Sequence, residues 1–266
     1  MDAEAEPSTE DRLRQLLRHL GIDQAHFAGY PADWPRLAAR YPEVFSSFTV
    51  IAAPSFDPRA VEPLAAKSLV ITGDRGRAAE ATLGGMDRLP GAELVTLPTT
   101  NEILGWSDVA AERTDELGGA MLQFLARMTA AAPSGIVALR EGEGEIAGIS
   151  YRIRGTGPPL VLLPMFLAPS QWEPLVPRLN KHYCTITLGG AALGAVAILE
   201  SRGRAAGYLH MVRTLIEEAQ LRPGEAVLEV GCGSGVLTAG WLAARQEPTA
   251  SPGSTSIRTF CRKPGP

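Results

Sequence analysis

The apolar positions of this 266-residue chain follow a helical period and a strand period in turn. Leu13, Leu16, Leu17 and Leu20 recur at helical spacing, and Gly21 follows them in the position of a helix C-cap. Short apolar runs bounded by turn residues then alternate with helical stretches, which predicts an α/β fold with a mostly parallel sheet and flanking helices. The runs predicted as strands in the first half cover 25–30, 47–54, 67–74 and 92–98.

The alternation pauses over 129–147, a stretch of small, charged and glycine residues that is predicted to be a linker. It resumes with strand-like runs, an amphipathic helix with apolar residues from Tyr208 to Ile216, and a strand at 226–230 that enters a glycine-rich turn. The pattern ends after Arg245. Residues 246–266 are therefore predicted to be a disordered or aberrant tail without a core strand. The strand-like runs before the amphipathic helix cover 149–155, 159–166 and 183–189.

Composition indicates the class of protein and its compartment, but says little about a reaction. Hydrophobic residues make up 45% and charged residues 20%, which is ordinary for a globular protein. The formal net charge of -4 gives no electrostatic reason to expect nucleic acid or an anionic membrane as a partner. Cys184, Cys232 and Cys261 are too few and too widely spaced for a disulfide framework or a zinc site. With an acidic N-terminus unlike a signal peptide, the sequence predicts a soluble, cytoplasmic protein.

Residues 12–125, within a predicted domain at 1–128, resemble the C-terminal half of an α/β-hydrolase. LLRHLGIDQAHFAGY is similar to the helix and strand that lead into the nucleophile elbow of that family. The elbow has the pattern G-x-S-x-G, because a sharp strand-to-helix turn must expose a hydroxyl among small neighbours. Here proline replaces the serine, and aspartate replaces the second glycine. The corresponding residues are Gly29, Tyr30, Pro31, Ala32 and Asp33.

The other two members of a hydrolase triad are also missing at the positions that the resemblance gives them. SLVITGD is similar to the strand that carries the acid, whose position falls on Gly76, with Asp74 as a possible substitute. AELVTLP is similar to the strand that precedes the catalytic histidine, and that position falls near Glu102. A serine hydrolase without nucleophile and base has no proton relay. We therefore expect a retained scaffold with an inactive site.

Residues 148–190 resemble the opening of an α/β-hydrolase, so a C-terminal half precedes an N-terminal half in this chain. Pro164 and Met165 stand where the family has His-Gly, whose backbone N–H groups help to form the oxyanion hole. Proline has no N–H to donate. We expect 12–125 and 148–190 to share one circularly permuted sheet, with two independent fragments as the alternative.

Residues 191–245 are predicted to be the start of a further domain. Within it, residues 195–245 resemble the start of a class I S-adenosylmethionine-dependent methyltransferase. LRPGEAVLEVGCGSGVL is similar to the first strand, glycine loop and helix of that family. Glycines let the backbone approach the cofactor, and the helix N-terminus presents free N–H groups to it. The resemblance implies S-adenosylmethionine as cofactor and an unidentified methyl acceptor. The cofactor-binding residues that it implies are Glu229, Gly231, Cys232, Gly233, Ser234 and Gly235.

The methyltransferase resemblance stops before the domain is complete. In that family a second strand ends about twenty residues later in an acid that holds the ribose. Residues 250–258 offer neither an acid nor a convincing strand. The sequence therefore predicts an incomplete methyltransferase-family protein, weakly active or inactive alone, which carries an inactive hydrolase-like region. Two alternatives stay open: a hydrolase-fold protein that acts as a non-catalytic binding module, and a truncated, non-functional gene product.

Overall fold

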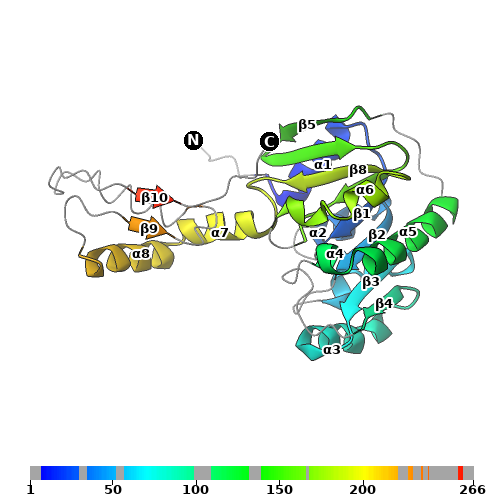
Figure 1. The fold of residues 1–266 in the computed structure, drawn as a ribbon, viewed down its shortest axis with the longest axis horizontal. Coiled ribbons are helices and arrows are strands. Elements are labelled where there is room, and N and C mark those ends of the chain that lie inside the picture. Colours follow the sequence, from blue (N-terminus) through cyan, green and yellow to red (C-terminus); the bar gives the residue numbers. More distant parts are fainter. Residues whose placement is uncertain are drawn as a thin grey trace. The chain divides into compact units, whose positions relative to one another are not determined.

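The structure of this chain is a computed structural model, and Figure 1 shows its ribbon. It divides into two compact units, residues 1–194 and 195–266, which are described separately below. The residues that the structure describes are 7–29, 35–51, 57–98, 109–131, 139–165, 168–220, 227–229, 235, 239 and 257–259.

The first unit is built on an eight-stranded sheet with the order β4-β3-β2-β1-β7-β8-β6-β5. Neighbouring strands from β4 to β8 along this order are parallel, whereas β6 is antiparallel to β8 and β5 is antiparallel to β6. The prediction of a mostly parallel sheet is confirmed. The strands are β1 (Ala25–Gly29), β2 (Phe45–Ile51), β3 (Ser68–Gly73), β4 (Glu93–Leu97), β5 (Gly142–Ile146), β6 (Ile149–Arg154), β7 (Pro159–Leu162) and β8 (Cys184–Gly189).

The two hydrolase-like segments of the sequence meet at the centre of this sheet. β1 pairs in parallel with β7, and His26, Phe27 and Ala28 lie opposite Leu160, Val161 and Leu162. From this pair, β2, β3 and β4 extend one side of the sheet, and β8, β6 and β5 extend the other. The expectation of one shared sheet is confirmed, and the alternative of two independent fragments is wrong.

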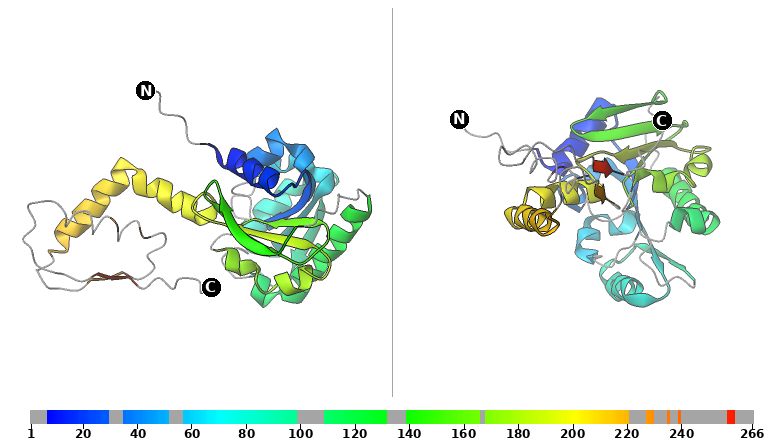
Figure 2. Two further views of the ribbon diagram at one scale, coloured as in Figure 1. Left: turned by 90° about the horizontal axis from the view of Figure 1, so that it is seen from above. Right: turned by 60° about the vertical axis from the view of Figure 1, so that its left-hand side comes forward.

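Helices cover both faces of the sheet, and each face has its own hydrophobic core (Figure 2). On one face α1 (Thr9–His19) and α2 (Pro35–Arg40) pack over a cluster that includes Phe27, Phe45 and Phe48. On the other face α5 (Thr114–Ala131) and α6 (Val176–Leu179) pack over a cluster around the fully buried Trp172. The unit also has α3 (Gly76–Gly85), α4 (Val109–Glu112) and 3-10 turns at Pro42–Val44, Pro58–Ala60, Glu62–Lys67, Met86–Arg88 and Pro169–Trp172.

The linker predicted over 129–147 is narrower in the structure. α5 continues to Ala131, and β5 occupies Gly142–Ile146 at the edge of the sheet. The sequence GEGEI has too few apolar residues to indicate a strand. It is tolerated here because β5 has one neighbour and is largely exposed. Ala147 and Gly148 join β5 to β6 with φ of 55° and 77°, the two positive values of a tight hairpin turn.

Among its described residues, the second unit has helices α7 and α8 and a short parallel strand pair. α7 begins at the unit boundary (Gly194–Arg204) and α8 follows (Ala206–Glu218). β9 (Val227–Glu229) pairs in parallel with β10 (Ile257–Thr259), so that Glu229 lies opposite Thr259. β10 lies within 246–266, the stretch predicted to be a tail without a core strand, and among the described residues it pairs with β9. A three-residue strand with a single apolar side chain lies below what periodicity can detect.

The close approach of β1 to β7 predicts the effect of one substitution. A Cβ added at Gly29 would lie 2.7 Å from the Cβ of Leu163 and 3.2 Å from its carbonyl oxygen. We expect Gly29→Ala to lower the free energy of unfolding by about 1–3 kcal/mol, because neither neighbour is a flexible chain end that can move aside. Urea denaturation measures this change.

Gly119→Ala in α5 is the matched control, since a Cβ at Gly119 meets nothing within 4 Å. In a helix this change is expected to be neutral or to stabilise by up to about 1 kcal/mol. Equal stability of the Gly29→Ala variant and the parent would contradict the close packing of β1 on the chain after β7.

Candidate functional site

The candidate site of the first unit lies at the carboxyl ends of β1 and β7. In open α/β sheets, ligands bind outside the carboxyl ends of the strands, where neighbouring strands lead to connections in opposite directions. β1 and β7 are such a pair, because their chains continue toward opposite sides of the sheet. Gly29 ends β1, and the N–H of Leu163 donates to the carbonyl of Ala28 at 2.8 Å.

Trp172 fixes the backbone that leaves β7. Its indole Nε1–H donates to the carbonyl oxygen of Leu163 at 2.7 Å, and its side chain is fully buried. Pro164 and Met165, which replace His-Gly in the hydrolase resemblance, are both buried. The segment after β7 therefore offers packed apolar side chains, and at Pro164 no N–H, where an oxyanion hole needs donors.

The structure places the candidate acid Asp74 directly after β3, at the carboxyl end of the sheet. Its carboxylate accepts a hydrogen bond from Arg75 Nε at 3.4 Å, and its charge also helps to raise the pKa of Arg113. The largest cause of that raised pKa is the hydrogen bond from Arg113 to Glu116. Gly76 begins α3. Residues 30–33 of the elbow and Glu102 lie outside the described residues.

The histidines and lysines of the first unit lie at the opposite ends of the strands from the candidate site. Of the four histidines in the chain, His19 ends α1 just before β1, His26 is the second residue of β1, and His182 precedes β8. The lysines of this unit also precede strands, Lys67 directly before β3 and Lys181 shortly before β8. Lys67 Nζ donates to the carbonyl of the first residue of β2 at 3.3 Å. Imidazole and ammonium groups of residues 1–194 are thus placed at the amino ends of the strands.

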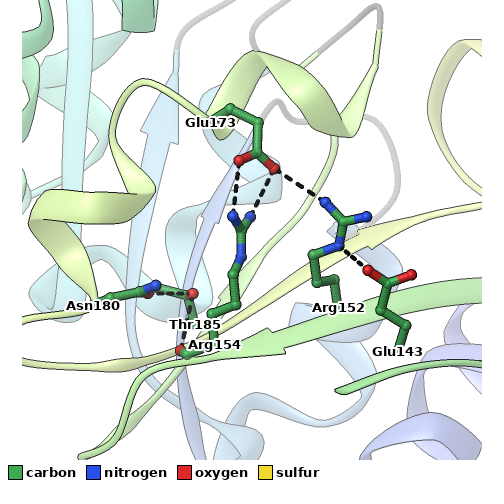
Figure 3. A network of polar contacts seen from close by, with 6 residues as sticks. All are labelled: Glu143, Arg152, Arg154, Glu173, Asn180 and Thr185. Atoms are coloured by element: carbon green, nitrogen blue, oxygen red, sulfur yellow. Dashed lines mark hydrogen bonds and ion pairs between the residues drawn. The ribbon is translucent and has the colours of Figure 1, made fainter. Parts of the chain in front are cut away.

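A charged network anchors the segment from Pro169 to Leu179 to β6 (Figure 3). Arg154 donates from its two Nη atoms to the two carboxylate oxygens of Glu173, at 2.8 and 2.7 Å. Arg152 lies 3.7 Å from the same carboxylate and bonds to Glu143 across the β5–β6 pair. The hydrogen bond from Arg154 is the largest cause that lowers the pKa of Glu173. The network thus fixes the segment from Pro169 to Leu179, which follows the candidate site along the chain. The sequence did not predict this network.

The glycine-loop site of the second unit is described only in part. Glu229 is the last residue of β9, and Gly235 has a φ of +83° with open space around its Cβ position. The N–H of Ala239 donates to the carbonyl of Gly235 at 2.9 Å, which is a helical spacing. Gly231, Cys232, Gly233 and Ser234 lie outside the described residues.

The described residues offer neither a metal site nor a membrane-spanning helix. Among them, no three His, Cys, Asp or Glu side chains are grouped so that they could hold a metal ion. In the same part of the chain, no helix has the length and apolar character needed to cross a bilayer.

Comparison with known proteins gives weak likenesses to hydrolase structures. No family model and no curated protein matches the chain. Seven chains of solved structures do match. A predicted CIB-like hydrolase from Thermoplasma acidophilum is 12% identical, with a TM-score of 0.36, over 46% of this chain and 58% of that one. A carboxylesterase structure from Nitrososphaera gargenis is 15% identical, with a TM-score of 0.38, over 49% of this chain and 76% of that one. The chain thus spans less than two thirds of the first of these proteins, and scores this low assign neither family nor activity.

The network around Glu173 predicts a pH-dependent contribution to stability. We expect Glu173→Gln to lower the free energy of unfolding at pH 7 by about 1 kcal/mol, after discounting for solvent screening. Because the folded pKa of Glu173 is lowered from 4.5, the advantage of the parent is complete above that pH and is lost as the pH falls below it. Urea denaturation of both proteins between pH 7 and pH 3.5 measures the difference.

Glu143→Gln is the matched control, because Glu143 is more exposed and bonds only to Arg152 among the described residues. Its effect should stay below about 0.5 kcal/mol. Equal losses in the two variants would mean that the paired bonds from Arg154 add nothing to an ordinary surface ion pair.

Proposed function

We propose that residues 1–194 form an α/β-hydrolase-fold module that binds a ligand or partner without turning it over. The order of the strands supports the fold part of this proposal. The strands can be renumbered so that β5 to β8 become strands 1 to 4 and β1 to β4 become strands 5 to 8. With these numbers the order across the sheet is 1-2-4-3-5-6-7-8, and strand 2 is antiparallel to its neighbours. A circularly permuted α/β-hydrolase sheet is expected to have this order.

The proposal that the module does not turn over its ligand rests on the positions of its histidines and lysines. A hydrolase of this class needs a nucleophile and a base within hydrogen-bond reach at the carboxyl end of the sheet. Every histidine and lysine of residues 1–194 lies at the amino ends of the strands instead. Since Pro164 also removes a backbone donor, proton relay and oxyanion stabilisation are both unsupported at the candidate site.

A fluorophosphonate probe tests this proposal, because it reacts with serines that a neighbouring base activates. We expect no stoichiometric labelling of the chain and no hydrolysis of p-nitrophenyl acetate above the rate of heat-denatured protein. Pro31→Ser restores a hydroxyl in the family pattern and should remain unlabelled, because no histidine is supplied with it. Labelling of the parent at a single serine would overturn the proposal.

We also infer a second candidate function for residues 195–266, the binding of S-adenosylmethionine. Its support is the positive φ of Gly235, the third glycine of the loop, together with the parallel pairing of β9 and β10 on either side of it in the sequence. Glu229 is the last residue of β9 and comes just before the glycine-rich loop in the sequence. β10 ends at Thr259 opposite Glu229, so the carboxylate expected to hold the ribose is replaced by a hydroxyl. Weak binding and little methyl transfer follow from this difference.

Isothermal titration of the chain with S-adenosylmethionine and its demethylated product tests the second candidate. We expect weak binding that Gly235→Ala reduces at least tenfold, because a Cβ at a φ of +83° strains the loop. Gly207→Ala in α8 is the control, since a Cβ there meets nothing within 4 Å, and its affinity should equal that of the parent. No heat of binding from folded protein would reject this function and leave the first proposal untouched.

A further inference from the structure

A buried cluster of polar side chains joins β1, β2 and α5 beneath the apolar core of the α5 face. His26 is fully buried, and its Nδ1 lies 2.8 Å from the hydroxyl of Ser47 on β2. Its Nε2 lies 3.0 Å from the hydroxyl of Thr129 in the last turn of α5. The ring of Tyr183, just before β8, packs edge-on at a centroid distance of 5.7 Å and an interplanar angle of 87°. One imidazole thus contacts side chains from three other segments of the unit.

The hydrogen bonds of Thr129 define the state of the imidazole. The Thr129 hydroxyl donates its proton to the carbonyl oxygen of Leu125 at 2.8 Å, so it can only accept from His26. His26 Nε2 therefore carries a proton, and Nδ1 is left with a lone pair that accepts from Ser47. Both ring nitrogens are satisfied when the imidazole is neutral.

A second proton on His26 has no counter-ion in these surroundings. The groups that face the ring are the hydroxyls of Ser47 from β2, Thr129 from α5 and Tyr183 from the loop before β8, and Leu160 is its register neighbour on β7. Tyr183 is the titratable member of this set, and burial raises the pKa of its phenol, so it stays neutral. Burial alone accounts for the lowering of the His26 pKa from 6.5 to about 4. Protonation would also force Ser47 to reverse its hydroxyl.

We propose that His26 is an acid-sensitive latch, whose protonation releases the last turn of α5 from the sheet. The bond between His26 and Thr129 ties the end of this helix to β1, and a second proton, placed at Nδ1, does not itself break it. The last turn opens because its departure lets water reach the charged ring, and Thr129 is partly exposed whereas Ser47 and Tyr183 are buried. Release hydrates the imidazole and frees the helix end, while Met121, Phe124 and Leu125 earlier in α5 remain in the core. A local opening of this kind costs less than unfolding of the whole unit, because few apolar contacts are lost.

The direction of the pH effect follows from the two states of His26. The closed state has the lowered pKa of about 4, and the released state has the ordinary value of 6.5. The latch is fully closed above pH 6.5 and loosens as the pH falls below it. The population of the released state should grow up to tenfold per pH unit down to about pH 4.

Hydrogen exchange of the full chain, resolved to single amides and corrected for the intrinsic pH dependence, tests the latch. Between pH 7 and pH 5 we expect the protection of amides 127–131 to fall by at least tenfold while the amides of β1 and β7 keep theirs. His26→Gln keeps a neutral side-chain donor for Thr129 and should make the protection of α5 independent of pH. His182→Gln, the same change at an exposed histidine, should behave like the parent.

Three results would overturn the latch. They are an unchanged protection of α5 in the parent, an acid response that survives in His26→Gln, and a simultaneous loss of protection in α5 and the central strands. If His26→Gln does not fold, the NMR titration of the parent decides instead. The His26 ring should titrate well below 6.5 and in step with α5 opening, and a His26 midpoint near 6.5 without opening would reject the proposal.

Discussion

The hydrogen-bonded pairing of β1 with β7 is the contact on which the rest of the first unit depends. It joins the strands that follow β1 to those that follow β7, and so it makes a single sheet from two halves of the sequence. Both apolar cores cross this junction. Phe27 and Val161 face one core, while Ala28, Leu160 and Leu162 face the other. Without the pair, each half would expose the edge of a fully buried strand to water, along with half of each core.

The amino ends and the carboxyl ends of the strands carry different kinds of side chain. At the amino ends, the imidazole of His26 is enclosed and bonded to Ser47 and Thr129, whereas the side chains of His19, Lys67, Lys181 and His182 are exposed. Such a buried network stabilises one arrangement of the strands and has no route to a substrate. At the carboxyl ends, where ligands of α/β sheets bind, the described side chains after β7 are apolar and packed. The histidines and lysines of residues 1–194 thus lie away from the strand ends at which α/β sheets bind ligands.

Much of this architecture could be read from the sequence, because the signals for it are local. Leu13, Leu16 and Leu17 predicted a helix with one apolar face, and all three are buried in α1. The apolar runs of the central strands predicted burial on both faces, as β1 and β2 show. β5 and β10 were missed because their sequences are polar or very short, and pairing with a neighbour alone makes them strands.

The residues of the candidate sites were predictable to a smaller extent. The sequence identified Pro164, Asp74, Glu229 and Gly235 because each stands in a motif with fixed spacing. The bond between Arg154 and Glu173, and the bond between His26 and Thr129, join residues with no periodic relation. Such contacts follow from tertiary packing and leave no local pattern in the sequence.

The order of the strands has a consequence for synthesis on the ribosome. β1 lies at the centre of the finished sheet, yet it is made near the beginning of the chain, and its partner β7 emerges only after β2 to β6. Throughout this interval one hydrogen-bonding edge of β1, whose five residues are all buried in the finished sheet, has no native partner. Nascent chains with such an edge bind one another or chaperones. Slow or interrupted synthesis of the second half of the unit therefore prolongs the exposure of this edge.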